Sequence, residues 1–202
     1  MKLYTGMGPN PRVVVVAIAE LGADIEVESV DLMAGENRAE AHLSRNPAGQ
    51  LPTLKLDDGS YLAEITAIAE YLDEKFAGSL IGATAEERAE TRMWVRRIDL
   101  NVCENLGAGF RYAEGLSLFK DRIHCIPQAA DDFKEITREK LSWLDGLMEG
   151  KDFMCGERFT LADILLFAFL EFGASIGQPL DAKCERLQAW YARVAARPSI
   201  AG

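Results

Sequence analysis

Residues 46–54 read Asn-Pro-Ala-Gly-Gln-Leu-Pro-Thr-Leu, a loop with two prolines that runs straight into a short apolar strand. Pro52 has no N–H group, so it belongs at the first residue or at the edge of a strand. The backbone amide and carbonyl of Leu51 are then free to face outward. Such a segment can pair with a peptide-like ligand as an added strand. An ordinary connecting loop is the alternative, and the sequence does not decide whether the bond before Pro52 is cis or trans.

The residues before this loop predict a β-α-β unit, which implies parallel strands joined by a right-handed crossover. Asn10 is a favoured N-cap residue and Pro11 suits the first helical position, while Gly22 is a natural stop. The predicted elements are a strand over residues 3–5, a helix over residues 11–21 and a strand over residues 25–30.

The residues around and after the loop predict a short helix or irregular turn, a hairpin and a further helix. Asp58-Gly59 between apolar runs is a strong hairpin signal. Glu64 opens the last helix, where an acidic residue suits the helix dipole. The predicted ranges are 37–44 for the turn, 53–56 and 61–62 for the strands and 64–76 for the helix. The first domain therefore reads βαβ-α-ββα.

The turn after the first strand partly matches a dinucleotide-binding fingerprint, with Gly6, Gly8 and an acidic residue, Asp31, about 20 residues further on. Pro11 stands where that fingerprint requires a third glycine, and no repeated βαβ series follows. A second reading takes the helix N-terminus beside Asn10 as an anion site. A third reading, compatible with the second, takes Asn10 as a cap only.

The rest of the chain predicts a linker over residues 77–83 and then helices only. Thr84 with Glu87, and Thr160 with Asp163, have the spacing of capping boxes. We assign the second box to folding, because its helix is apolar on nearly every side and should be buried. The helices are predicted from residue 84 to about 106, from 127 to 150, from 160 to 172 and from 187 to 196.

Composition excludes several classes of function. The 202 residues carry a net charge of −10 and have no cluster of Lys or Arg, which argues against nucleic acid. No apolar run is long enough for a signal peptide or a membrane span, so we expect a cytoplasmic protein. Four distant cysteines indicate free thiols, and two histidines make a metal site improbable.

The order of elements in the first domain resembles the thioredoxin-like domain of cytosolic glutathione transferases, as found in bacteria. The specific matches are MKLY at residues 1–4, PNPR at 9–12, NPxGQLPxL at 46–54 and ExxAIxxYL at 64–72. The likeness continues through the helical second half and covers nearly the whole chain. It implies a glutathione-binding domain over residues 1–77 and an all-α domain over residues 84–202 that forms the pocket for an electrophile.

The resemblance implies that glutathione is a co-substrate whose thiol must ionise to act as nucleophile. Leu51 should pair with its cysteinyl part, Gln50 and Asn37 should lie beside its glycyl end, and Glu64 and the next residue should receive the γ-glutamyl end. The full implied set is Asn10, Asn37, Gln50, Leu51, Pro52, Glu64 and Ile65.

Family members usually stabilise the thiolate with a Ser, Tyr or Cys in the first turn, but Gly8 occupies the usual Ser or Thr position here. Some bacterial relatives use an Asn two residues before the corresponding basic residue, Arg12. That residue is Asn10, our candidate catalytic group, with Thr5 as the alternative. Ile65 also replaces a usual Ser, and one lost charge-assisted bond would weaken binding about tenfold or more.

The candidate electrophile pocket comprises Arg97, Asn101, Asn105, Phe110 and Tyr112, although each also fits a scaffold role. Arg96, Arg97 and Asp99 could instead serve a subunit interface, since the family is typically dimeric. Three functions remain open. They are conjugation of glutathione to a hydrophobic electrophile in detoxification; another glutathione-dependent reaction, such as ether cleavage, peroxide reduction, dehalogenation or isomerisation; and non-catalytic binding.

Overall fold

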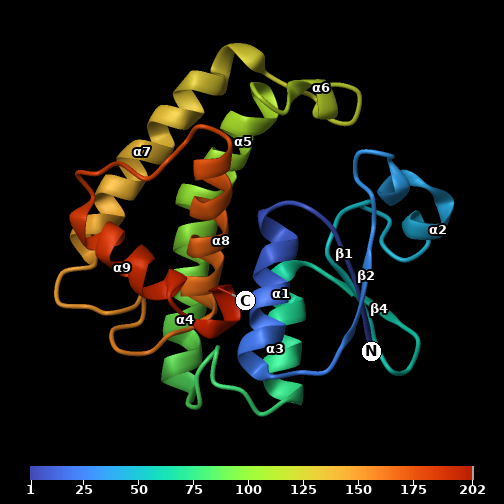
Figure 1. The fold of residues 1–202 in the computed structure, drawn as a ribbon, viewed down its shortest axis with the longest axis horizontal. Coiled ribbons are helices and arrows are strands. Elements are labelled where there is room, and N and C mark those ends of the chain that lie inside the picture. Colours follow the sequence, from blue (N-terminus) through green and yellow to red (C-terminus); the bar gives the residue numbers. More distant parts are fainter. Residues whose placement is uncertain (202) are drawn as a thin grey trace. The chain divides into compact units, whose positions relative to one another are not determined.

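The computed structural model describes residues 1–201, which form two compact units, one of Met1–Ile81 and one that begins at Gly82. Figure 1 shows strands only in the first unit and helices throughout the second. This agrees with the predicted combination of a thioredoxin-like domain and an all-helical domain.

The first unit contains one four-stranded sheet of order β2-β1-β3-β4. β1 pairs with β2 in parallel and β3 pairs with β4 antiparallel, as predicted. β1 also pairs with β3 antiparallel. The strands are β1 (Lys2–Thr5), β2 (Glu26–Ser29), β3 (Thr53–Lys55) and β4 (Tyr61–Ala63). The helices are α1 (Pro9–Leu21), the 3₁₀ turn η1 (Glu36–Arg38), α2 (Glu40–Leu43) and α3 (Ile65–Lys75).

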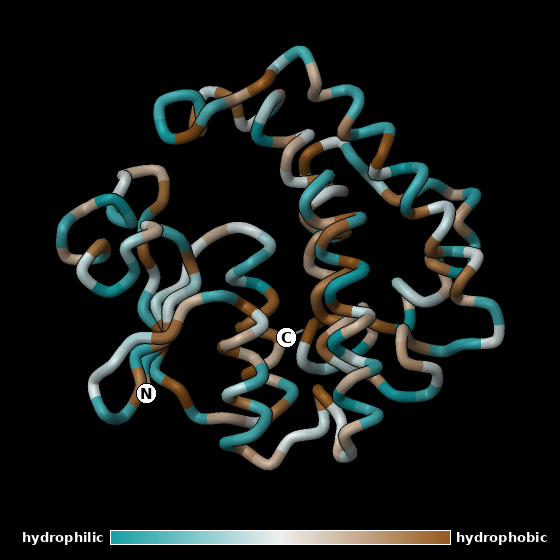
Figure 2. The backbone as a smooth tube through the Cα atoms, turned by 180° about the vertical axis from the view of Figure 1, so that it is seen from behind, coloured by the Kyte–Doolittle hydropathy of each residue, from teal (hydrophilic) through white to brown (hydrophobic). Residues whose placement is uncertain are grey.

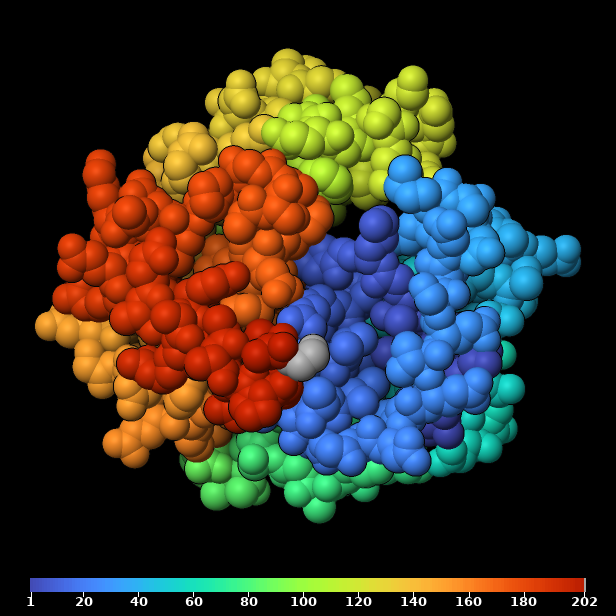
Figure 3. All heavy atoms as spheres, in the orientation of Figure 1, coloured from blue at the N-terminus to red at the C-terminus, as the bar shows by residue number. Residues whose placement is uncertain are grey.

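Helices α1 and α3 lie side by side against the sheet (Figure 1). Their inward residues join those of the strands in one apolar cluster of Leu3, Val14, Ile25, Leu54, Ile68 and Leu72. The segment with η1 and α2 forms a surface lobe of this unit, drawn in light blue in Figure 3. The core therefore fixes the strand ends from which the loops of the site emerge.

Helix α1 starts two residues earlier than predicted, which corrects the assignment of its cap. Gly8 is the N-cap, with φ of 118°, and Pro9 and Asn10 are the first two helical residues. Asn10 therefore caps nothing, and its exposed side chain forms no hydrogen bond within residues 1–201. Because Pro9 and Pro11 have no N–H, the first turn also offers fewer free amides than an ordinary helix.

The segment after α3 belongs to the first unit because Asp73 holds it there. The carboxylate of Asp73, which is 5% exposed, accepts hydrogen bonds from the amides of Leu80 at 2.7 Å and Ile81 at 3.3 Å. A buried carboxylate with backbone donors is a stable arrangement.

The second unit is built from helices and the loops that join them. They are α4 (Ala85–Ile98), the π-helical segment η2 (Asp99–Cys103), α5 (Glu104–Tyr112), α6 (Leu116–Phe119), the 3₁₀ turn η3 (Pro127–Ala129), α7 (Ala130–Leu147), α8 (Leu161–Ser175), α9 (Glu185–Ala195) and α10 (Pro198–Ala201). The capping box of Thr84 and Glu87 is present at the start of α4.

Two predictions for this unit were wrong in detail. The first long helix is interrupted by η2, since π-helical geometry is not visible in apolar periodicity. The helix predicted over residues 187–196 is also not the final one, because a further helix, α10, begins at Pro198. Proline is well suited to a first helical position, where its missing N–H leaves no bond unmade.

Helix α8 is the buried helix that the sequence predicted. Eleven of its residues are buried. Figure 2 shows hydrophobic residues, in brown, along the helices of this unit. The capping box of Thr160 and Asp163 starts it. The carboxylate of Asp163 also accepts hydrogen bonds from the amide of Met154 and the indole N–H of Trp190 at 2.8 and 2.9 Å.

Asp163 is fully covered, and burial raises the pKa of its carboxyl from 3.8 to about 6, despite the hydrogen bonds that lower it. The folded state therefore binds a proton more tightly than the unfolded state does. Stability from this residue is fully present below pH 4 and is lost as the pH rises through about 6.

All four cysteines are free thiols, as predicted. No helix within residues 1–201 is long and apolar enough to cross a membrane.

Candidate glutathione site

The candidate residues of the first unit meet at one end of its sheet. Thr53 pairs with Tyr4 on β1 and with Ala63 on β4. Pro52 therefore lies next to Thr5 on one side and next to Glu64 on the other, because the register continues one residue beyond each strand. The loop into α1, the loop into β3 and the start of α3 share this end.

The loop after β1 packs directly on Leu51. A Cβ atom on Gly6 would lie 2.9 Å from Cδ1 of Leu51 and 2.9 Å from the carbonyl oxygen of Val30, closer than side chains approach. Only glycine allows this contact. The Leu51–Pro52 bond is cis.

The backbone of Leu51 has no hydrogen-bond partner among the described residues. Within residues 1–201 no hydrogen bond reaches its N–H or its carbonyl, although its side chain is buried. A buried residue with unpaired backbone groups is unusual, because such groups are normally satisfied. The prediction that Leu51 keeps its backbone free of internal partners is therefore confirmed.

The carbonyls before Leu51 are bound to the segment that precedes the loop. Nδ2 of Asn37 donates to the carbonyl of Gly49 at 2.6 Å, and Arg38 donates to the carbonyl of Ala48 at 3.2 Å. Asn37 is 5% exposed, so it supports the loop from inside. Arg38 is exposed, and its positive charge lies beside the loop at Gly49. The side chain of Gln50 is exposed as well.

The start of α3 presents a second group of free donors. Glu64 is the N-cap residue and has φ of 69°, which residues other than glycine rarely adopt. Its side chain does not cap the helix, so the amides of Ile65 and Thr66 have no internal partner within residues 1–201. These amides and the helix dipole suit a carboxylate, while the exposed carboxylate of Glu64 suits an ammonium group.

The two candidate thiol donors differ in access. Asn10 is exposed, and its carboxamide can donate. The hydroxyl of Thr5 is covered and has no partner among the described residues. A ligand atom can therefore reach Asn10 without any rearrangement of this unit.

The residues assigned to the electrophile pocket divide into two groups in the second unit. Arg97, Asn101 and Asn105 follow one another around η2, where the Nδ2 atoms of the two asparagines bond backbone carbonyls. Phe110 and Tyr112 pack instead against aromatic rings of their own unit, Phe110 on Phe119 and Phe172 and Tyr112 on Phe133.

Three of the four cysteines are buried and poorly suited to act as nucleophiles. Burial raises the pKa of the Cys103 thiol well above its usual value and also raises the pKa of Cys155 and Cys184. No group of three metal-binding side chains gathers anywhere in residues 1–201.

The sequence did not reveal Arg38 or His42, whose Nε2 lies 3.1 Å from the carbonyl oxygen of Gln50, as contacts of this loop. The sequence feature that indicates the turn of this loop is Asn46 before a proline. Its side-chain oxygen accepts a hydrogen bond from the amide of Ala48 in an Asx turn. The side chains that bind the loop carbonyls come from a segment without strong periodicity, where contacts are set by tertiary packing.

These features define a protein with a thioredoxin-like unit, whose free backbone donors meet at one sheet end, and an all-helical unit. The family model of the glutathione S-transferase N-terminal domain matches residues 1–74, and that of the C-terminal domain matches residues 116–198. The chain therefore belongs to the glutathione S-transferase family.

Individual relatives agree over the full length. Glutathione S-transferase 2 of Saccharomyces cerevisiae is 30% identical, with 97% of this chain and 85% of the relative aligned. Glutathione S-transferase GstA of Escherichia coli O157:H7 is 29% identical, with 99% and 95% aligned. A crystal structure of a glutathione S-transferase domain-containing protein from Marinobacter aquaeolei VT8 superposes with a TM-score of 0.92 at 38% identity, covering 99% of this chain and 100% of that one.

Proposed function

We propose that this protein is a glutathione transferase that binds glutathione along the first unit and activates its thiol for attack on a hydrophobic electrophile. The observation that carries the proposal is the unpaired backbone of Leu51, placed between the free amides of α3 and the exposed side chain of Asn10. A tripeptide has complementary groups for each of these positions.

Each part of glutathione has a partner in this proposal. Its cysteinyl amide and carbonyl pair with Leu51, next to Pro52. Its γ-glutamyl carboxylate binds the amides at Ile65, and its ammonium group faces Glu64. Its glycyl carboxylate lies near Gln50 and the charge of Arg38, while Asn37 acts indirectly by holding Gly49.

Asn10 supplies the thiol chemistry in this proposal. A free thiol with a pKa of ~8.5 is only a few per cent ionised at pH 7, so activation requires a decrease of ~2 units, or ~2.7 kcal/mol. A hydrogen bond to a charged group contributes ~1.5 to 3 kcal/mol, and a helix N-terminus adds ~0.3 to 1. The amide N–H of Asn10 and the α1 dipole together reach this range without a general base.

The electrophile contacts the second unit, for which Arg97 is the best candidate because its guanidinium has no carboxylate partner within residues 1–201. Asn101 and Asn105 are further candidates beside it, while Phe110 and Tyr112 support the helical unit through their aromatic packing. A homodimer in the cytoplasm, with detoxification as its role, completes the proposal, as the family resemblance implies.

Calorimetry with glutathione tests the binding step, and turnover of 1-chloro-2,4-dinitrobenzene tests the reaction. We expect a dissociation constant in the micromolar to low millimolar range and formation of the thioether. If glutathione binds but no electrophile, peroxide or thioether is converted to product, the proposal is reduced to binding alone. If calorimetry detects no heat of binding at millimolar glutathione, the proposal is refuted.

A second candidate is a glutathione-binding protein without turnover. It is favoured by the two prolines in the first turn of α1, which leave fewer amides to stabilise a thiolate. The pKa of bound glutathione separates the two, because only the transferase needs it lowered.

A further inference from the structure

The carbonyl of Gln50 accepts hydrogen bonds from three buried side chains. Nδ2 of Asn46 lies 3.0 Å from this oxygen, Nε2 of His42 lies 3.1 Å away and Oγ1 of Thr53 lies 3.4 Å away. His42, Asn46 and Thr53 are 2%, 4% and 0% exposed. A carbonyl has two lone pairs, so three donors use its full capacity and fix its direction.

Fixing this carbonyl also fixes the amide of Leu51, because both belong to one planar peptide group. The Gln50–Leu51 bond is trans, so its C=O and its N–H point in opposite directions. The three donors hold the oxygen toward the interior of the unit. The N–H of Leu51 is thereby aimed away from it.

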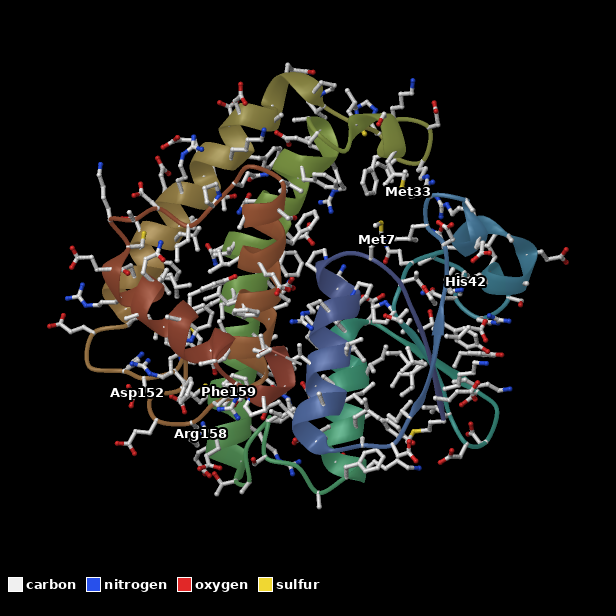
Figure 4. All side chains as sticks on the ribbon, viewed as in Figure 1. Met7, Met33, His42, Asp152, Arg158 and Phe159 are labelled. Atoms are coloured by element: carbon white, nitrogen blue, oxygen red, sulfur yellow. The ribbon has the colours of Figure 1, made fainter. Side chains whose placement is uncertain are left out.

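His42 is the donor that comes from outside the loop and strand. It projects from α2 toward the strands (Figure 4). A carbonyl oxygen only accepts, so Nε2 of His42 must carry the proton. Nδ1 is covered and has no hydrogen-bond partner among the described residues. A proton on Nε2 therefore makes this contact, while a proton on Nδ1 would find no acceptor among the described residues.

We propose that His42 is a positioning residue for glutathione, which aims the Leu51 amide by holding the Gln50 carbonyl from behind. It touches no substrate atom. This inference rests on the proposed function for its effect on affinity, while the tautomer and the hydrogen bond are properties of the free protein.

The test uses the substitutions His42→Phe and His42→Gln in the full chain. Phe removes the donor, and Gln replaces it because its Nε2 occupies a similar position. We expect His42→Phe to raise KM for glutathione roughly threefold to tenfold, as the loss of one hydrogen bond allows, with kcat changed less than about twofold. His42→Gln should remain near the wild-type KM.

His124→Phe is the matched control, because His124 is exposed and lies in the second unit. It should leave KM unchanged. A folded His42→Phe variant with wild-type KM would overturn the inference, and so would a His42→Gln variant as impaired as His42→Phe. If His42→Phe fails to fold, the KM of His42→Gln and the position of the imidazole proton in the wild type test the inference instead.

The tautomer is measured by nitrogen NMR of the labelled imidazole in the wild-type protein. We expect a protonated Nε2 coupled to the Gln50 carbonyl and an unprotonated Nδ1. A proton on Nδ1 instead of Nε2 would overturn the inference even if the protein bound no glutathione. If the tautomer is as expected but the protein binds no glutathione, the proposed function and the effect of His42 on affinity are both refuted. Only the hydrogen bond between His42 and the loop would then stand.

Discussion

Replacing Asn10 with Ala tests thiol activation directly. The side chain is exposed and bonds nothing within residues 1–201, so its removal should cost little stability. Its N–H to the thiolate is worth ~1.5 to 3 kcal/mol, which corresponds to a rise of about 1 to 2 units in the pKa of bound glutathione.

The pH dependence of the rate distinguishes lost activation from general damage. At about pH 6, kcat/KM of Asn10→Ala should fall roughly 10- to 100-fold, because the thiolate population falls by that factor. At about pH 9 both enzymes hold ionised thiol, so the ratio should shrink to within a few fold.

The assay is the pH profile of conjugation, together with ultraviolet titration of the thiolate in the binary complex. Asn10→Asp should raise the thiol pKa further than Asn10→Ala, since a like charge disfavours the thiolate. An unchanged thiol pKa in Asn10→Ala, or a loss of rate equal at all pH values, would refute the reasoning and direct attention to Thr5.

Two further predictions concern the glutathione site, and a third concerns the stability of the helical unit. Pro9→Ala adds an amide donor to the first turn of α1 and should lower the pKa of bound glutathione by a few tenths of a unit; titration showing a rise would contradict it. Ile65→Ser adds a hydroxyl at the start of α3 and should tighten glutathione binding about tenfold by calorimetry, whereas Thr66→Ala, the matched control beside it, should change nothing. Asp163→Asn should be less stable than the wild type in urea. The difference between their free energies of unfolding should narrow by about 2 to 3 kcal/mol between pH 4 and 7, because only the wild type loses stability as its carboxyl ionises. A difference independent of pH would show that Asp163 does not titrate in this range.

The sequence predicted the fold well because its strongest signals are local. The Asp58-Gly59 turn, the two capping boxes and the apolar run of α8 each depend on neighbouring residues. Pro9 explains the error at α1, since either of two nearby prolines could begin the helix and only packing selects the first.

The site was predictable at Leu51 and less so around it. Proline chemistry identifies the free backbone from sequence alone, whereas the bonds from Asn37 and His42 to the loop carbonyls require the tertiary positions of η1 and α2. The positive φ of Glu64 also gives no sequence signal, because a charged residue at that conformation is rare.

A crystal structure of the protein with glutathione tests the central claim most directly. We expect the cysteinyl backbone to pair with the N–H and carbonyl of Leu51, and the sulfur to lie within hydrogen-bonding distance of Nδ2 of Asn10. Glutathione bound elsewhere, or a sulfur atom turned away from the start of α1, would contradict it.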